Sequence, residues 1–121
     1  MKPHKLNSYE LTQSIGELIL MTENFHDPLE VAGNVYKLKM ENVRVRVFEV
    51  TFNPGDKAAM HHHPDHVVYV LMGGKMRLTS MGKTDVLDLA DGDAIFLNAQ
   101  LHEAENIGQS TLELIVVELK K

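Results

Sequence analysis

The chain has 121 residues, which is enough for one domain with its own core but too few for two ordinary domains. Hydrophobic residues make up 44% of the sequence and charged residues 24%, as in globular proteins and unlike disordered ones. There are no cysteines, and the formal net charge is −5. Disulfides, thiolate metal sites and cysteine nucleophiles are therefore excluded, and without a basic cluster nucleic acid is not an expected partner.

The first 34 residues have no regular strand pattern. Residues 8–22 place apolar side chains at roughly helical spacing, but Gly16 weakens a helix, and a strand at 17–21 fits nearly as well. Asp27-Pro28 and Gly33-Asn34 then resemble turns. No stretch has the apolar run of a signal peptide or the roughly 20 apolar residues that cross a membrane. We therefore expect a cytoplasmic protein with an N-terminal arm (1–34) and one domain (35–121).

From Val35 onward, short segments rich in β-branched residues alternate with turn residues. Gly73-Gly74 and Gly82-Lys83 are predicted as turns that join neighbouring strands, the first as a tight hairpin. About eight short strands with frequent turns predict an all-β, single-domain antiparallel β-barrel or jelly roll. Seven of these strands are predicted at 43–52, 67–72, 75–80, 85–89, 94–97, 102–106 and 111–119.

The chemistry of this chain is concentrated in the segment MHHHPDH, residues 60–66. On a strand, side chains two positions apart share a face, so His61 and His63 can both point inward while His62 points outward. Two imidazoles bind a metal weakly, and His102, at the start of a later strand, is the best third ligand. The alternatives are a solvated histidine loop and, for His102, an interior histidine held by hydrogen bonds. Imidazole nitrogens suit divalent transition metals, here Zn, Ni, Fe, Mn or Cu.

Two sequence motifs resemble those of the cupin superfamily, in particular the small single-domain (cupin type 2-like) conserved-barrel proteins. The first motif is Pro-Gly, five residues, His-any-His, a glutamate and, six residues later, a glycine. The second is a glycine, five residues, a proline, a glycine close behind, a histidine and, four residues on, an asparagine. In this chain the proline position holds Asn98 and the second glycine position holds Gln100. The matching positions are Pro54, Gly55, His61, His63 and Gly73 for the first motif and Gly92, His102 and Asn106 for the second. The resemblance covers about residues 35–119.

The resemblance implies a metal held by both histidines of the first motif, its glutamate and the histidine of the second. This supports His61, His63 and His102 as ligands. The glutamate position holds His66, and its spacer is one residue short. His66 therefore remains a candidate fourth ligand, with a hydrogen-bond partner of the ligands and a surface residue as alternatives. Without the glutamate the site also lacks an obvious general base.

Several other residues have a functional and a plainer interpretation. Tyr69, Phe96 and Met76 could line a pocket beside the metal, although apolar residues of barrel strands more often form plain core. Arg44 and Arg46 alternate with valines and are expected on the solvent face of their strand, with contact to an anionic substrate as the alternative.

The resemblance implies a superfamily that includes dioxygenases, isomerases, lyases and ligand-binding modules, and fold does not choose among them. The first hypothesis is a metal-binding barrel with a small-molecule pocket, acting on a small organic acid or carbonyl compound. The alternative is a non-catalytic ligand-binding or sensor barrel. The sequence alone does not decide whether the protein is an enzyme. The resemblance also implies a homodimer, and uncovered strand edges are an independent reason to expect one.

Overall fold

The structure of the protein is a computed structural model that describes residues 26–121. This part of the chain forms nine strands and one short helix, and it contains no helix long and apolar enough to span a membrane. The helix is α2 (Pro28–Val31). The strands are β1 (Tyr36–Glu41), β2 (Val45–Phe52), β3 (Lys57–His63), β4 (His66–Met72), β5 (Gly74–Ser80), β6 (Lys83–Leu89), β7 (Ala94–Leu97), β8 (Gln100–Asn106) and β9 (Leu112–Leu119).

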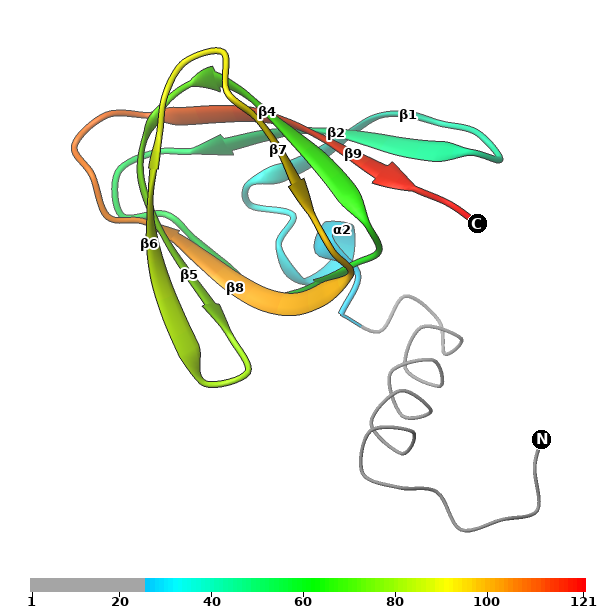
Figure 1. Cartoon of the computed structure of the whole chain (residues 1–121), viewed down its shortest axis with the longest axis horizontal. Coiled ribbons are helices and arrows are strands. Elements are labelled where there is room, and N and C mark those ends of the chain that lie inside the picture. Colours follow the sequence, from blue (N-terminus) through cyan, green and yellow to red (C-terminus); the bar gives the residue numbers. More distant parts are fainter. Residues whose placement is uncertain (1–25) are drawn as a thin grey trace, which may run out of the picture.

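The strands form two antiparallel sheets that face each other (Figure 1). One sheet has the order β1-β2-β9-β4-β7 and the other β3-β8-β5-β6. Apolar side chains from the inner faces fill the space between the sheets, which is how such a sandwich obtains its core. The predicted all-β barrel or jelly roll is confirmed. The fully buried apolar residues include Phe48, Val50, Phe52, Val70 and Leu112.

The inward face of β2 differs from the sequence-based expectation. Phe48 and Val50 are fully buried, and the two-residue repeat of a strand places Arg46 on the same inner side. The expected solvent position of Arg46 is therefore wrong, whereas Val43 is 87% exposed. The sequence is ambiguous here because its apolar positions are odd-numbered up to Val47 and even-numbered from Phe48. The larger aromatic side chains decide which face is buried.

The connection at Gly73 is also different from the prediction. Strands β4 and β5 belong to different sheets, so Gly73-Gly74 is a crossover and not a hairpin. A Cβ atom on Gly73 would lie 2.1 Å from the carbonyl oxygen of Leu89, so only glycine allows the chain to pass here. By contrast, β5 and β6 do form a hairpin. Its turn residues Met81 and Gly82 both have positive φ, 53° and 75°, which suits the twist of paired strands.

Residues 26–34, the end of the predicted arm, pack on the barrel through helix α2. The Asp27 carboxylate accepts a hydrogen bond from the backbone N–H of Leu29 at 2.9 Å and caps the helix. Pro28 occupies the first turn, where its missing N–H costs nothing, and it is buried together with Ala32. The predictions made for residues 8–22 lie outside the described residues.

Candidate metal centre

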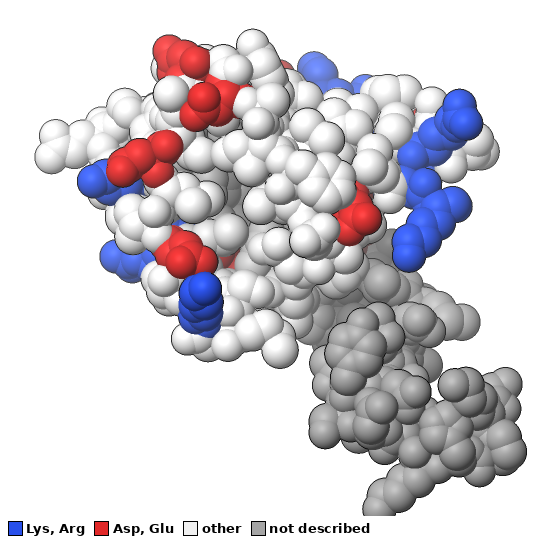
Figure 2. Space-filling model, viewed as in Figure 1, with Lys and Arg blue, Asp and Glu red and all other residues white. Residues whose placement is uncertain are grey.

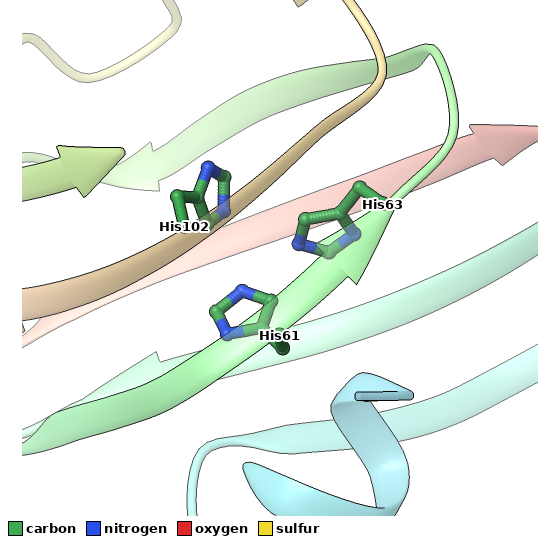
Figure 3. Close-up of side chains that lie close together, drawn as sticks. All are labelled: His61, His63 and His102. Carbon is green, nitrogen blue, oxygen red and sulfur yellow. The ribbon is translucent and has the colours of Figure 1, made fainter. Parts of the chain in front are cut away.

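His61, His63 and His102 converge inside the barrel (Figure 3). His61 and His63 project from β3, and His102 projects from β8, where it lies directly opposite His61 in the strand pairing. The three side chains are 0%, 1% and 3% exposed. Each offers a ring nitrogen, and these nitrogens all lie within 4.8 Å of one another. The predicted three-histidine group is therefore brought together with its nitrogens facing one point.

An irregularity in β3 orients this group. The pairing of β3 with β8 shifts register between Ala58 and His61, as at a β-bulge. Ala58 and His61 are both buried although they are three positions apart, which an uninterrupted strand does not allow. After the bulge the ordinary alternation resumes, so His63 also points inward and the half-buried His62 points to the other face. The bulge thus determines which histidines reach the interior.

The hydrogen bonds of the outer ring nitrogens determine the tautomers of His61 and His102. The Nδ1 atom of His61 lies 2.6 Å from the carbonyl oxygen of Ala59, which can only accept, so Nδ1 carries the proton. The Nδ1 atom of His102 lies 2.7 Å from Oε1 of Gln100. The amide orientation is fixed because Gln100 Nε2 donates to the carbonyl oxygen of Asn98 at 3.0 Å. Both histidines therefore direct an unprotonated Nε2 inward.

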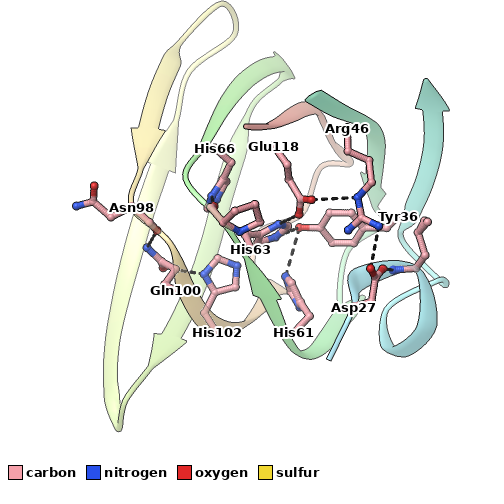
Figure 4. A network of polar contacts seen from close by, with 12 residues as sticks. Asp27, Tyr36, Arg46, His61, His63, His66, Asn98, Gln100, His102 and Glu118 are labelled. Atoms are coloured by element: carbon pink, nitrogen blue, oxygen red, sulfur yellow. Dashed lines mark hydrogen bonds and ion pairs between the residues drawn. The ribbon is translucent and has the colours of Figure 1, made fainter. Parts of the chain in front are cut away.

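His63 is held by a buried chain of charged groups (Figure 4). Its Nδ1 atom lies 2.6 Å from Oε2 of Glu118 on β9. The other carboxylate oxygen of Glu118 accepts from Arg46 Nε at 3.0 Å, and Arg46 also donates to Asp27 at 2.8 Å. The chain links the histidine cluster to the N-cap of α2. Such a carboxylate behind a histidine fixes the ring orientation and makes its other nitrogen a stronger ligand.

Burial keeps these histidines neutral. Removal from water, and then the neighbouring histidines, lowers the pKa of His61 to about 4 and that of His102 to about 3. The pKa of His63 is well below its usual value for the same reasons. Burial also raises the pKa of Glu118 to about 7, and the Arg46 charge opposes that rise. Neutral imidazoles at physiological pH have the lone pairs that a metal needs.

Tyr36, at the start of β1, contacts the inward nitrogens. Its hydroxyl oxygen lies 2.9 Å from Nε2 of His63 and 3.4 Å from Nε2 of His61. Burial raises the pKa of this phenol well above its usual range, so the hydroxyl stays protonated and donates to the unprotonated Nε2 of His63. The Tyr36 hydroxyl therefore lies at the point toward which the Nε2 atoms of His61 and His63 face.

His66, the candidate fourth ligand, is buried beside the cluster but is not part of the convergent group. Its side chain is 1% exposed, and its Nδ1 donates to the carbonyl oxygen of Pro64 at 2.7 Å. Its ring centroid lies 4.4 Å from that of His63 and 6.2 Å from that of His102. His66 thus packs against His63 from the β4 side, and the surface position considered from the sequence does not occur.

A cavity adjoins the histidines between the two sheets. It has a volume of about 40 Å³, and its lining includes Met76, one of the residues expected beside the metal. Tyr69 and Phe96 do not line it. They lie on the outer side of the five-stranded sheet, 44% and 54% exposed. The reason is strand parity, because Val68 and Val70 occupy the inward positions of β4 and leave Tyr69 pointing outward.

The histidine cluster also lies within a match to a protein-family profile. The profile of the cupin domain matches residues 48–118, which include all four inward histidines and Glu118. The chain belongs to the cupin family.

Solved structures with the same fold include a cupin domain from Bordetella pertussis and a cupin 2 conserved barrel domain protein from Salinispora arenicola. The first is 24% identical, covers 72% of this chain and 93% of its own, and has a TM-score of 0.68. The second is 20% identical, covers 71% and 74%, and has a TM-score of 0.55. No curated protein matches the sequence. At these identities the likeness concerns the cupin fold alone.

The donor set of this cupin is compatible with one divalent transition metal. Three neutral imidazole nitrogens from His61, His63 and His102 would hold it, which leaves coordination positions for water or another ligand. Such a metal would supply Lewis acidity at the end of the apolar cavity.

Sequence reasoning missed three residues that support this cluster: Tyr36, Gln100 and Glu118. Of these, Glu118 could have been noticed in the sequence. It shares the parity of Leu114 and Val116, so it is a charged residue on the inward face of an apolar strand.

Proposed function

We propose that this cupin binds one divalent transition metal through His61, His63 and His102 and presents it to a small organic acid or carbonyl compound. The observation that carries the proposal is the orientation of the rings. The acceptors behind His61, His63 and His102 hold a proton on each Nδ1, which leaves three unprotonated Nε2 atoms facing one point. The single Tyr36 hydroxyl can donate to only one of these atoms, so the other lone pairs remain available to a metal.

The proposed chemistry is of the dioxygenase, isomerase or lyase type. A metal held by these histidines would supply Lewis acidity toward an oxygen of the substrate, and iron would in addition allow dioxygen chemistry. Residues of the barrel would supply the other requirements of such a reaction. Glu118 fixes His63, Tyr36 offers a hydroxyl proton donor, and the apolar cavity excludes bulk water from the bound molecule.

The second candidate function is a non-catalytic ligand-binding or sensor barrel. It is favoured by one observation: the lining of the cavity in the described residues contains no carboxylate that could remove a proton from a bound molecule. The two functions differ in the fate of the ligand. An enzyme changes a small acid or carbonyl compound during incubation with the metal-loaded protein, whereas a sensor returns it unaltered, which NMR of the supernatant distinguishes.

The metal site is tested by equilibrium dialysis against Zn²⁺ using protein without a histidine tag. The wild type is expected to bind one equivalent, and His61→Ala is expected to lower the affinity at least about tenfold because an inward ligand is lost. His62→Ala is the matched control, since it removes a histidine from the same strand on the opposite face. Equal effects of the two substitutions, or no binding by the wild type, would refute the proposal.

A further inference from the structure

The cavity beside the histidines is apolar except at one end. Tyr36, His63, His66 and His102 are the only polar residues that line it in the described part of the chain. All other lining side chains are aliphatic, aromatic or methionine, and they come from both sheets. A molecule in this space therefore meets hydrogen-bonding groups at one end only. A charged or strongly polar group placed at the other end would lose its water without gaining a partner.

The size of the cavity limits its occupant. At about 40 Å³ it has room for roughly three water-sized groups, while a cavity that binds benzene is nearer about 150 Å³. A hydrocarbon part of about three carbon atoms fits and an aromatic ring does not. The residues at the mouth are also apolar. The partly exposed members of the lining are all aliphatic, so entry too favours an aliphatic group; they are Leu78, Leu87, Ile95 and Leu97.

The polar end favours an anionic head group. The three ligand side chains are imidazoles and not carboxylates, so a divalent metal there would keep its positive charge. The charged side chains behind His63 bond to one another and to His63; they are Glu118, Arg46 and Asp27. A carboxylate is a head group that neutralises part of this charge and offers oxygen ligands.

Tyr36 provides a second contact for the head group. Its hydroxyl donates to the Nε2 lone pair of His63, and that same lone pair is needed for metal coordination. A metal would therefore leave the Tyr36 hydroxyl as a buried donor without an acceptor. A carboxylate oxygen at the metal would restore an acceptor at that position.

We propose that the cavity binds a short-chain aliphatic monocarboxylate, with its carboxylate at the metal and the Tyr36 hydroxyl and its hydrocarbon chain among the apolar side chains. This inference rests on the proposed metal site and adds the substrate class. Butyrate is the matching probe, because its hydrocarbon chain has three carbon atoms, the length for which the cavity has room. Acetate lacks most of the chain, and succinate has the same number of carbons but a second carboxylate that would enter the apolar end.

The test is a titration of Co²⁺-loaded protein, followed by the visible absorption of the cobalt. Butyrate is expected to change the spectrum with a half-saturating concentration about tenfold below that of acetate, since it buries two more methylene groups. Succinate is expected to need at least about tenfold more than butyrate because its second carboxylate is desolvated without a partner. Equal or better binding of acetate or succinate would overturn the proposed ligand class.

A pair of tyrosine variants tests the head-group contact. Tyr36→Phe is expected to raise the half-saturating butyrate concentration about tenfold, because a hydrogen bond to a charged group is lost. Tyr69→Phe removes the same hydroxyl from the outer surface and is expected to change nothing. An unchanged butyrate response of Tyr36→Phe, or loss of its cobalt, would overturn the role given to Tyr36.

Cobalt content is measured in every sample before acid is added, which separates the two proposals. Wild-type protein that takes up no cobalt would refute the metal site and the ligand inference with it. Wild-type protein that takes up cobalt but does not prefer butyrate would refute the ligand inference alone.

Discussion

At the scale of single residues, the groups that accept hydrogen bonds from the Nδ1 atoms of the histidines orient the rings of the candidate metal site. The histidines could be selected from the sequence because they are reactive residue types at a recognisable spacing. Glu118 is marked only by its inward position on an apolar strand, and its partner depends on which strands become neighbours. Gln100 lies two residues from His102 on the same strand, but its residue type does not point to a role beside a histidine. Glu118 is 55 positions from His63 along the chain, and only the placement of β9 brings the two together.

The contribution of Glu118 can be measured with Glu118→Gln. The amide can still accept from His63, but its N–H₂ group then faces Arg46, which is also a donor. We expect the metal affinity to fall about 10- to 100-fold, as is usual when the carboxylate behind a ligating histidine is altered. Glu113→Gln, on the outward face of the same strand, is the matched control in the same zinc dialysis. Equal affinities of the two variants would contradict this role of Glu118.

The buried histidines also predict how the stability of the metal-free protein depends on pH. Their folded-state pKa values lie below 6.5, so below about pH 6.5 the unfolded chain binds more protons and the free energy of unfolding falls with acidification. The loss from His61 continues to about pH 4. Between its ordinary pKa and about 7, Glu118 binds more protons in the folded chain than in the unfolded one, so it opposes this loss of stability. It is a single group, however, and the opposite effect comes from four buried histidines.

Urea unfolding of chelator-treated protein at pH 7, 6 and 5 checks this expectation. Each fully desolvated histidine contributes about 1.4 kcal/mol per pH unit at most, so the midpoint should move to clearly lower urea on acidification. His61→Asn should have a shallower pH dependence than the wild type. A midpoint that rises toward pH 5 would mean that Glu118 dominates and that the histidines are not neutral.

At the scale of elements, the positions of the strands along the chain were predictable, but which strands pair with one another was less so. Strand β7 was predicted at 94–97 and occupies that range, because its apolar run is bounded by turn residues on both sides. The assumed hairpin at Gly73-Gly74 was wrong because two glycines permit several chain paths. The face of β2 was also misjudged, since an arginine can be buried when carboxylates pair with it, here Glu118 and Asp27.

Gly73→Ala tests the crossover between the two sheets. The new Cβ would meet the backbone oxygen of Leu89 at 2.1 Å, and backbone cannot move aside as a flexible side chain can. We expect a loss of more than about 2 kcal/mol in the free energy of unfolding, as for other forced overpacking. Gly55→Ala is the comparison, because its site is open and only its φ of +87° is unfavourable, costing about 1–2 kcal/mol. A Gly73→Ala protein as stable as the wild type would contradict the close approach.

At the scale of the whole molecule, the homodimer stays a prediction, and the structure supplies a surface for it. On the outer side of the five-stranded sheet, one apolar residue from each strand lies in a continuous row. The row is Met40, Val47, Val117, Val67 and Phe96. Figure 2 shows few Lys, Arg, Asp or Glu side chains near the middle of the face turned toward the viewer. A second copy of the chain could pair with this row through the same surface.

Light scattering at micromolar concentration tests the dimer. We expect the wild type to have twice the chain mass of 13.6 kDa and Phe96→Ser to shift the population toward the single chain. Phe96 is 54% exposed, so the substitution should leave the fold intact. A wild-type mass of one chain would refute the prediction, and an unaffected Phe96→Ser dimer would move the interface elsewhere.

The central claim is that three histidines, and not four, hold one metal in this barrel. The most direct measurement is an anomalous difference map from crystals of zinc-loaded protein. We expect one strong peak about 2.0–2.1 Å from the Nε2 atoms of His61, His63 and His102, with His66 beyond bonding distance. The absence of a peak there, or a peak that His66 also coordinates, would contradict it.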